Sequence, residues 1–318
     1  MTDPTNNHSN HGAQRLPHGS YPAMLTAFLD DGQIDWEGVD RLTDFCIDHG
    51  AAGIFACGLS AEIGEMDDEE KGALAERIVR HAAGRVPMVV GAITSGAIEK
   101  QATLARRVHD AGADVVAIAV CQLADEDEDD QQWIANAESL LEKLPAKLRL
   151  SMYECPWPYH RLLSLDMLRW AAGTGRFHFM KDTCCTISTI RDRLNLLQDS
   201  PLQLLNANTA TLLASLQAGS DGFCGIGANY LPKLYAWLCQ NYSRQPEQAA
   251  ALQDFLASTV PLTESPIYPA LAKEYLRQQG LKIGTYSRKL PAGLPTDCSA
   301  QLSQMHRSET EWLERVEV

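Results

Sequence analysis

The sequence predicts an α/β protein built on a parallel sheet, and two observations indicate this. From residue 21 onward, short apolar segments alternate about eight times with longer amphipathic ones, which is the pattern of repeated β/α units. Residues 86–92 form a continuous apolar segment, as expected for a strand that is covered on both faces. Eight units in about 210 residues without a linker favour a closed (β/α)8 TIM barrel over an open doubly wound sheet, which remains the alternative.

Each expected element follows from this alternation. The expected strands are residues 21–28, 53–57, 86–92, 115–120, 148–153, 177–181, 202–206 and 222–226. The expected helices between them are residues 36–49, 67–83, 98–111, 131–143, 165–172, 187–197 and 209–218. The first helix is amphipathic and is followed by Gly50, a suitable C-cap. The second begins with an acidic turn, which complements the helix dipole.

The two ends of the chain differ from this repeat. Residues 1–17 are rich in Asn, His, Pro and Gly, and they predict a disordered leader rather than a signal peptide. The barrel is expected over residues 18–230. Residues 231–318 predict a C-terminal helical region that packs on the barrel exterior or mediates oligomerisation. Its expected helices are residues 231–242, 248–256, 267–279 and 299–316.

Composition excludes several classes of protein. A net charge of −14 and a pI near 5.0 argue against nucleic acid as a partner. No segment reaches the roughly 18 apolar residues of a membrane span. Nine cysteines without CxxC spacing are typical of reduced thiols in the cytoplasm. The acidic run at residues 125–130 predicts a solvated loop before a helix, because it lacks the glycine turn of a calcium loop.

The segment 177–180 is apolar and ends in Lys181. A desolvated lysine amine loses proton affinity and becomes a nucleophile, although a strand-terminal lysine can also point to solvent. Tyr153 ends the preceding expected strand, and neighbouring strands lie about 4.8 Å apart. An amine that attacks a ketone forms a carbinolamine, whose hydroxyl needs a proton donor in order to leave as water. Tyr153 is the expected acid and base for this step.

Glycine-containing segments follow two other expected strands. Gly58, Leu59 and Ser60 follow the second strand, and their exposed N–H groups are suited to hold a carboxylate, with Ser60 in reach of the Tyr153 phenol. Gly225 leaves space for a substrate over the last strand. Each of these features alone is weak evidence for a site.

Several cysteines also fall near strand ends, which raises a metal or redox interpretation. Small apolar packing is the favoured interpretation, because no histidine lies at those ends in a ligand position. No metal site is therefore expected. The six cysteines are Cys57, Cys121, Cys155, Cys184, Cys185 and Cys224.

Four ordered motifs carry a resemblance to a known family. They are GLSAE at residues 58–62, YECP at 153–156, FMKD at 179–182 and GFCGIGAN at 222–229. Residues 24–28 and 31–35 also look like the first strand and turn of that family. In order and spacing, residues 19–291 resemble the dihydrodipicolinate synthase and N-acetylneuraminate lyase superfamily.

The resemblance implies a class I aldolase mechanism without a metal or organic cofactor. Lys181 would form a Schiff base with a 2-oxo acid, commonly pyruvate, and Tyr153 would shuttle the proton. The implied substrate-binding residues are Gly58, Leu59, Ser60, Cys224 and Gly225. The resemblance also implies a homo-oligomer, either a dimer or a tetramer.

This chain departs from the family pattern at three places. The family loop usually reads GTTGE or GSTGE, and here Leu59 and Ala61 replace a hydroxyl residue and a glycine. Residues 121–123 replace the tyrosines that synthases carry after strand four. Synthases carry an arginine after the YxxP motif, and here Arg161 is a candidate for that role in binding a second substrate, together with Gln122. A solvated or helix-capping arginine is the competing interpretation of Arg161.

These departures argue against the condensation of lysine biosynthesis. The sequence therefore predicts a Schiff-base lyase or aldolase that acts on pyruvate or a related 2-oxo acid. A dehydratase on the same scaffold and a non-catalytic barrel that binds a 2-oxo acid are the alternatives. An enzyme that uses pyridoxal phosphate is a weaker third, because a buried lysine also suits that cofactor.

Overall fold

The computed structural model describes residues 15–294 and 298–316, so most of the expected leader lies outside the described residues. Eight parallel strands form one sheet in the order β1-β8-β7-β6-β5-β4-β3-β2. The strands are β1 (Gly19–Ser20), β2 (Ile54–Ala56), β3 (Met88–Gly91), β4 (Val115–Ala119), β5 (Leu150–Tyr153), β6 (Phe177–Asp182), β7 (Gln203–Asn206) and β8 (Gly222–Phe223).

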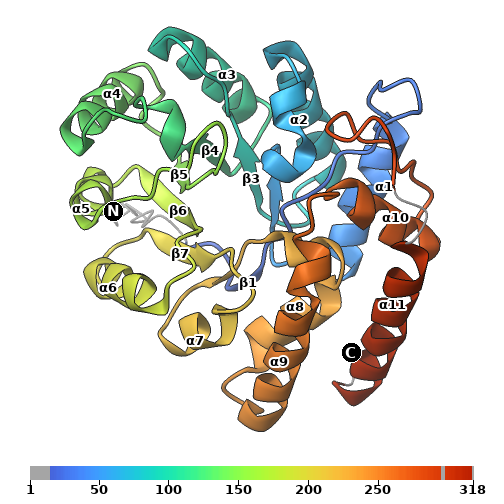
Figure 1. Cartoon of the computed structure of the whole chain (residues 1–318). Helices are drawn as coiled ribbons and strands as arrows, with labels where there is room; N and C mark the ends of the chain where they lie inside the picture. The colour runs from blue at the N-terminus through green and yellow to red at the C-terminus, as the bar shows by residue number, and fades with distance from the viewer. Residues whose placement is uncertain (1–14, 295–297, 317–318) are drawn as a thin grey trace, which may run out of the picture.

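The sheet closes on itself between β1 and β2. A parallel bridge joins Ala23 to Phe55. The Ala52 N–H donates to the Ser20 carbonyl at 2.9 Å, and the Phe55 N–H donates to the Pro22 carbonyl at 3.1 Å. The predicted (β/α)8 TIM barrel with a C-terminal helical extension is thereby confirmed, with the helices in a ring around the strands (Figure 1).

The predicted bounds of the first and last strands were wrong. A strand was expected over residues 21–28, but the regular strand is Gly19–Ser20, because Pro22 has no N–H to donate to a ladder. The following residues still reach both neighbouring strands: the Tyr21 N–H donates to Phe223, and the Met24 N–H donates to Phe55. The last strand was expected over residues 222–226, but it ends at Phe223. Residues 226–229 instead form the short 3-10 helix η4 (Ile226–Asn229).

Seven helices alternate with the strands close to the expected positions. They are α1 (Trp36–Asp48), α2 (Asp68–Ala82), α3 (Ile98–Asp110), α4 (Asp130–Glu142), α5 (Leu165–Thr174), α6 (Ile187–Leu197) and α7 (Leu212–Gln217). Side chains cap several N-termini as the sequence suggests. Asp67 accepts from the Glu70 N–H at the start of α2. The expected acidic loop ends in Asp129, which caps α4 by accepting from the Gln132 N–H.

The C-terminal region has two parts. Helix α8 (Pro232–Asn241) packs on β1 and β8 and is the eighth helix of the ring. Within it, the Tyr235 ring stacks on Phe223 at 4.3 Å. The remaining helices are α9 (Pro246–Thr263), α10 (Ala270–Gln278) and α11 (Cys298–Arg315). Helix α11 runs along α8 and α9 on the outside of the ring (Figure 1).

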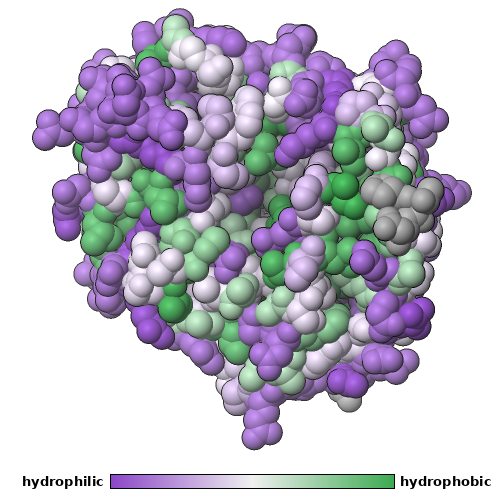
Figure 2. Space-filling model, viewed as in Figure 1, coloured by the Kyte–Doolittle hydropathy of each residue, from purple (hydrophilic) through white to green (hydrophobic). Residues whose placement is uncertain are grey.

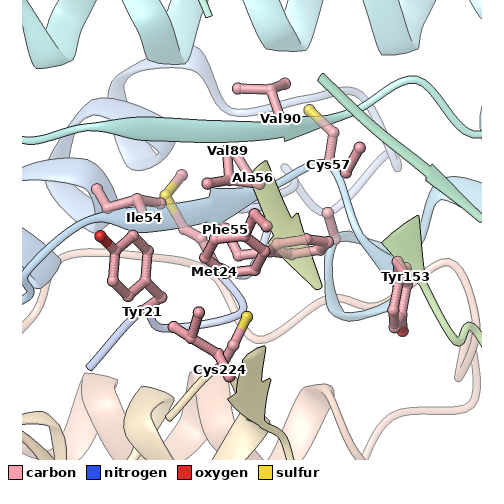
Figure 3. Close-up of a cluster of buried hydrophobic side chains, with 14 of the residues drawn as sticks. Tyr21, Met24, Ile54, Phe55, Ala56, Cys57, Val89, Val90, Tyr153 and Cys224 are labelled. Atoms are coloured by element: carbon pink, nitrogen blue, oxygen red, sulfur yellow. The ribbon is translucent and has the colours of Figure 1, made fainter. Parts of the chain in front are cut away.

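The interior of the barrel is filled by apolar and aromatic side chains. Phe55 lies in the middle of this cluster, with Tyr153 at its edge (Figure 3). The Phe55 ring centroid is 5.3 Å from that of Tyr153 and 6.3 Å from that of Phe179. In the space-filling view, hydrophilic residues dominate the periphery of the molecule (Figure 2). Within the described residues, no helix is long and apolar enough to cross a membrane.

Candidate active site

A cavity of about 260 Å³ lies where the carboxyl ends of several strands meet. Both Lys181 and Tyr153 line it, at the ends of the adjacent strands β6 and β5. The full lining comprises Leu59, Ser60, Tyr153, Pro156, Lys181, Thr183, Cys185, Ala207, Asn208, Gly225, Ile226, Glu264, Tyr268, Pro269 and Lys289. This is the end of the barrel at which TIM-barrel enzymes place their active sites.

Lys181 is buried, with 4% of its surface exposed. Its Nζ lies 4.6 Å from the centroid of the Phe55 ring and 4.5 Å from that of Tyr153. Within the described residues, its amine has no carboxylate in an ion pair, in contrast to the paired lysines of this chain. Burial lowers the pKa of Lys181, although the nearby Cys224 and Cys155 oppose the shift. The amine therefore loses its proton more readily than a solvated lysine does.

Tyr153 is paired with Lys181 in the register of β5 and β6. Burial raises the pKa of Tyr153 well above its usual value, and the charge of the Cys155 thiol adds to the shift. A phenol with a raised pKa keeps its proton at neutral pH. Tyr153 is thus placed beside the amine as a proton donor.

Two cysteines extend this arrangement behind Tyr153. Cys155 follows Tyr153 by two residues and is fully buried, and its backbone N–H donates to the Tyr153 carbonyl at 2.7 Å. The neighbouring Cys121 is the main cause that lowers the pKa of Cys155 to about 7, and the Trp157 N–H also contributes. Cys121 Sγ itself donates to the Trp157 carbonyl at 3.1 Å. The sequence suggested apolar packing for these cysteines, and both side chains are buried.

Ser60 contacts a different phenol from the one expected. Ser60 lowers the pKa of the Tyr268 phenol, and no hydrogen bond between Ser60 and Tyr153 is present in the described part of the chain. Asn229 Nδ2 also donates to the Tyr268 hydroxyl at 3.0 Å. Burial raises the pKa of Tyr268. Tyr268 was missed in the sequence because it lies in the C-terminal region, far from any strand end.

The loop after β2 offers two free N–H groups at the cavity. Residues Leu59–Ala61 form the 3-10 helix η1, with Gly58 at its N-cap. Within the described residues, neither the Leu59 nor the Ser60 N–H donates to an acceptor. Gly58 does not line the cavity, and an added Cβ there would come within 2.7 Å of the Phe55 ring. The glycine is therefore required for the close approach of this loop to the barrel interior.

The two residues expected at strand eight have different positions. Gly225 lines the cavity, and a Cβ there would lie 2.5 Å from the Ala207 carbonyl oxygen. Cys224 is fully buried and does not line the cavity. Burial raises the pKa of Cys224 to about 12, and the charge on Lys181 partly opposes this. Cys224 thus contributes to the environment of the lysine rather than to the cavity wall.

The structure does not bring Arg161 to the cavity. Its guanidinium donates to the Glu128 carbonyl at 2.8 Å and to the Asp130 carboxylate at 3.0 Å. These contacts hold Arg161 against the acidic loop, at the start of α4.

Gln122 also lies away from the Lys181 cavity. Its side chain accepts from the Ala119 N–H at 2.9 Å and donates to Gln101 at 3.0 Å. It lines a second cavity of about 470 Å³ beside the acidic loop, together with Cys121.

The C-terminal region supplies one wall of the Lys181 cavity, which the sequence did not suggest. Glu264 at the end of α9, Tyr268 and Lys289 all line it. Partial burial raises the pKa of Glu264. The C-terminal region, predicted to pack on the barrel exterior or to mediate oligomerisation, thus also contributes residues to the cavity.

A buried carboxylate fixes this wall to the loop after β2. Glu62, in the left-handed conformation after η1, accepts from Lys273 Nζ at 2.6 Å and from the Ser287 hydroxyl at 2.8 Å. It also accepts from the Lys289 N–H at 3.0 Å. One side chain thus holds the Leu59–Ser60 amides and the Lys289 segment in a fixed relation.

A second buried network lies beneath β5 and β6. Arg193 of α6 pairs with Glu154 at 2.7 Å and also with Asp182. The Glu154 carboxylate accepts in addition from the Thr183 N–H at 2.8 Å. Because Glu154 and Asp182 directly follow Tyr153 and Lys181, this network holds both strand ends, while the carboxylates themselves lie outside the cavity lining.

No group of three or more His, Cys, Asp or Glu side chains in residues 15–294 and 298–316 is arranged to hold a metal ion.

Comparison with protein families gives a match over the first part of the barrel. The model of the dihydrodipicolinate synthetase family matches residues 16–123. Two similar relatives are named 4-hydroxy-tetrahydrodipicolinate synthase. That of Laribacter hongkongensis is 28% identical over 73% of this chain and 78% of the relative. That of Saccharophagus degradans is 27% identical over 83% of this chain and 91% of the relative.

Solved structures show the same fold. A monomeric dihydrodipicolinate synthase variant superimposes with a TM-score of 0.81 and 21% identity, covering 94% of this chain and 98% of the variant. A prophage protein of the dihydrodipicolinic acid synthase family from E. coli K12, in complex with pyruvate, gives a TM-score of 0.80 at 21% identity, covering 94% of this chain and 98% of that protein. The first of these is a monomer by its description, and homo-oligomerisation of the present chain stays a prediction.

Proposed function

Since the chain belongs to the dihydrodipicolinate synthase and N-acetylneuraminate lyase superfamily, we propose that it is a lyase that forms a Schiff base between Lys181 and pyruvate or a related 2-oxo acid. The observation that carries the proposal is the unpaired buried amine of Lys181 beside the Tyr153 phenol, in a cavity at the carboxyl ends of the strands. The pyruvate complex of the E. coli relative supports the choice of substrate class.

The first step is attack of the neutral Lys181 amine on the ketone carbon. Burial raises the fraction of neutral amine, because it lowers the pKa of Lys181. The C–N bond forms, the C=O π bond breaks, and a proton moves from the nitrogen to the oxygen, which gives the hydroxyl of a carbinolamine. Tyr153 then donates its proton to this hydroxyl, which leaves as water, and the C=N bond of the protonated Schiff base forms.

The substrate carboxylate is assigned to the loop after β2. The free Leu59 and Ser60 N–H groups would bind its oxygens, since oriented backbone N–H groups form anion sites. Ser60 and Tyr268 lie at the same wall. With the carboxylate held there, the ketone carbon faces the amine. The protonated Schiff base then withdraws electrons from the neighbouring carbon, so that a C–C bond at that carbon forms or breaks.

The test is reductive trapping with a panel of 2-oxo acids. Pyruvate and borohydride should add one pyruvate-derived adduct, located at Lys181 by peptide mass spectrometry. Lys273, a second buried lysine over an aromatic ring, serves as an internal control and should stay unmodified. An unmodified Lys181 with every 2-oxo acid of the panel would exclude the proposal.

The finer proposal is that this lyase is not a synthase of lysine biosynthesis. The engagement of Arg161 by the acidic loop supports this, because its guanidinium is not available at the cavity. The wall formed by Glu264 and Lys289 would instead meet the far end of the substrate. Production of 4-hydroxy-tetrahydrodipicolinate at a rate comparable to that of the relatives would contradict this finer proposal. Turnover of any 2-oxo acid that depends on Lys181 would exclude the alternative of a non-catalytic binding barrel.

A further inference from the structure

Tyr268 is a second phenol at the Lys181 cavity, and the steps proposed above do not use it. It lines the cavity and lies just before helix α10, so it comes from the C-terminal region rather than from a strand end. Burial raises the pKa of Tyr268, and the phenol therefore keeps its proton at neutral pH. The question is where this O–H group points.

The side chain of Asn229 in η4 fixes the direction of the phenol. Asn229 Nδ2 donates to the Ala23 carbonyl at 2.8 Å and to the Tyr268 hydroxyl at 3.0 Å. A carbonyl only accepts, so the atom that faces Ala23 is the amide nitrogen, which only donates. The Tyr268 oxygen is therefore the acceptor in this contact. Its own hydrogen is not used there and remains available to a ligand in the cavity.

Two contacts place Tyr268 beside the loop after β2. Ala23, which contacts the same amide group, is bridged to Phe55 in β2. Lys273 of α10 bonds to Glu62 at 2.6 Å, and Glu62 is the C-cap of η1 in that loop. The loop and the segment that carries Tyr268 therefore meet at one wall of the cavity.

This wall lies away from the reacting amine. In the closed ring of eight strands, β1 and β2 lie opposite β5 and β6, which carry Tyr153 and Lys181. The Leu59 and Ser60 N–H groups, which donate to no acceptor in residues 15–294 and 298–316, belong to the β2 side. Tyr268 thus shares its side of the cavity with the amides that are assigned to the substrate carboxylate.

We propose that the Tyr268 hydroxyl is a third hydrogen-bond donor to the substrate carboxylate, beside the Leu59 and Ser60 N–H groups. The inference rests on the proposed function. A carboxylate accepts through two oxygens with about four lone-pair positions, so it has room for three donors. A hydrogen bond to an ionised acceptor is roughly twice as strong as one between neutral groups. The phenol therefore favours 2-oxo acids over uncharged ketones.

The two phenols of the cavity have different tasks. The Tyr153 ring lies 4.5 Å from Lys181 Nζ, and its proton is needed when the carbinolamine loses water. Tyr268 donates to a carboxylate that keeps its charge throughout the reaction. Loss of an interaction that is equal in the ground state and the transition state weakens binding without slowing the chemistry. The two phenols should therefore affect different kinetic parameters.

The test measures the rate at which pyruvate forms the borohydride-trapped adduct, over a range of pyruvate concentrations. In Tyr268→Phe, the pyruvate concentration for half-maximal rate should rise about tenfold or more, while the rate at saturating pyruvate changes little. In Tyr153→Phe, the saturating rate should fall instead. With pyruvamide, whose amide group carries no charge, Tyr268→Phe should change the half-maximal concentration by a smaller factor.

Tyr230 offers a matched control. Its ring centroid lies 6.3 Å from that of Tyr268, and its buried hydroxyl has no hydrogen-bond partner among the described residues. It does not line the cavity, so Tyr230→Phe should leave the half-maximal pyruvate concentration unchanged.

Three results would overturn the inference while the proposed function stands. In the first, Tyr268→Phe has the half-maximal pyruvate concentration of the wild type. In the second, it loses as much with pyruvamide as with pyruvate. In the third, its saturating rate falls as far as that of Tyr153→Phe. If the wild-type protein forms no adduct with any 2-oxo acid, the inference and the proposed function are both overturned.

Discussion

Lys181 and Lys273 are both buried lysines, and their neighbourhoods differ in one respect. Both ammonium groups lie over aromatic rings, Lys181 at 4.5 Å from Tyr153 and Lys273 at 4.5 Å from Phe28. Burial lowers the pKa of both. Lys273 has the Glu62 carboxylate at 2.6 Å and the Tyr286 carbonyl at 2.8 Å, whereas Lys181 has no such acceptor in the described part of the chain.

The difference separates a structural lysine from a reactive one. A carboxylate at hydrogen-bond distance holds the proton on Lys273, so its amine is not available as a nucleophile. The Lys181 amine lies over the rings of Phe55 and Tyr153, and in the described residues it forms no ion pair with a carboxylate. The same side chain at the same degree of burial therefore serves two purposes, and the carboxylate decides which. Four predictions test this contrast, from the largest expected effect to the smallest.

Replacing Lys181 by methionine should abolish adduct formation and lower turnover by more than about 10³-fold, because the nucleophile is lost. Stability should not fall, since an unpaired buried amine is replaced by an apolar chain of similar length. Peptide mass spectrometry after borohydride treatment measures the first effect, and urea unfolding measures the second. A variant that still forms the adduct would show that another lysine is the nucleophile.

Replacing Lys273 by methionine should lower the free energy of unfolding by about 3–5 kcal/mol, because Glu62 is left buried without its cation. Urea unfolding measures this loss. The double variant Lys273→Met with Glu62→Gln should be more stable than the single variant, since no unpaired charge remains. A loss below about 1 kcal/mol in the single variant would mean that the Glu62–Lys273 pair stabilises the fold no more than an exposed ion pair does. That result would contradict the structural role assigned to Lys273.

Replacing Tyr153 by phenylalanine should slow adduct formation by about 10²-fold, because the proton donor for the carbinolamine is lost. Tyr268→Phe is the comparison variant, because it removes a phenol from the same cavity without touching Lys181. Its effect on the rate should be smaller than that of Tyr153→Phe. Stopped-flow or quenched trapping with pyruvate measures both rates, and equal effects would argue against a special role for Tyr153.

The rate of adduct formation should depend on pH in a way that reflects the burial of Lys181. Only the neutral amine attacks, so the rate should rise as the pH increases and Lys181 loses its proton. Because burial lowers the pKa of Lys181 from its ordinary value of 10.5, the rate should level off below that pH. Trapping at a series of pH values measures the profile. A rate that is still rising at pH 10.5 would mean that the amine behaves as a solvated lysine.

The sequence predicted the barrel and the proximity of Lys181 and Tyr153 because both depend on which segments are strands. Continuous apolar segments indicate strands that are covered on both faces, and the carboxyl ends of the strands in a parallel barrel lie at one end of it. Lys181 and Tyr153 close adjacent strands, so their proximity follows from topology alone. The exact start of β1 did not follow, because Pro22 breaks the ladder while the chain stays extended.

The parts of the site that the sequence missed depend on long-range folding. Tyr268, Glu264 and Lys289 reach the cavity only because the C-terminal region folds back over the barrel. No periodicity within that region indicates which face it will meet. Similarly, the position of Arg161 in the chain made it a candidate for substrate binding. Its guanidinium points to the acidic loop instead, because it donates to the Glu128 carbonyl there.

The bond between Glu62 and Lys273 joins positions that are 211 residues apart. During synthesis from the N-terminus, the loop that is assigned to the substrate carboxylate emerges early, but its anchor arrives only when α10 has left the ribosome. A nascent chain that contains all eight strands therefore still lacks the wall formed by Tyr268 and Lys289. A shortened chain that ends after α8 would lack this wall, so Lys181 would lie in a cavity that is open on one side. The complete cavity would thus be among the last features of the molecule to form.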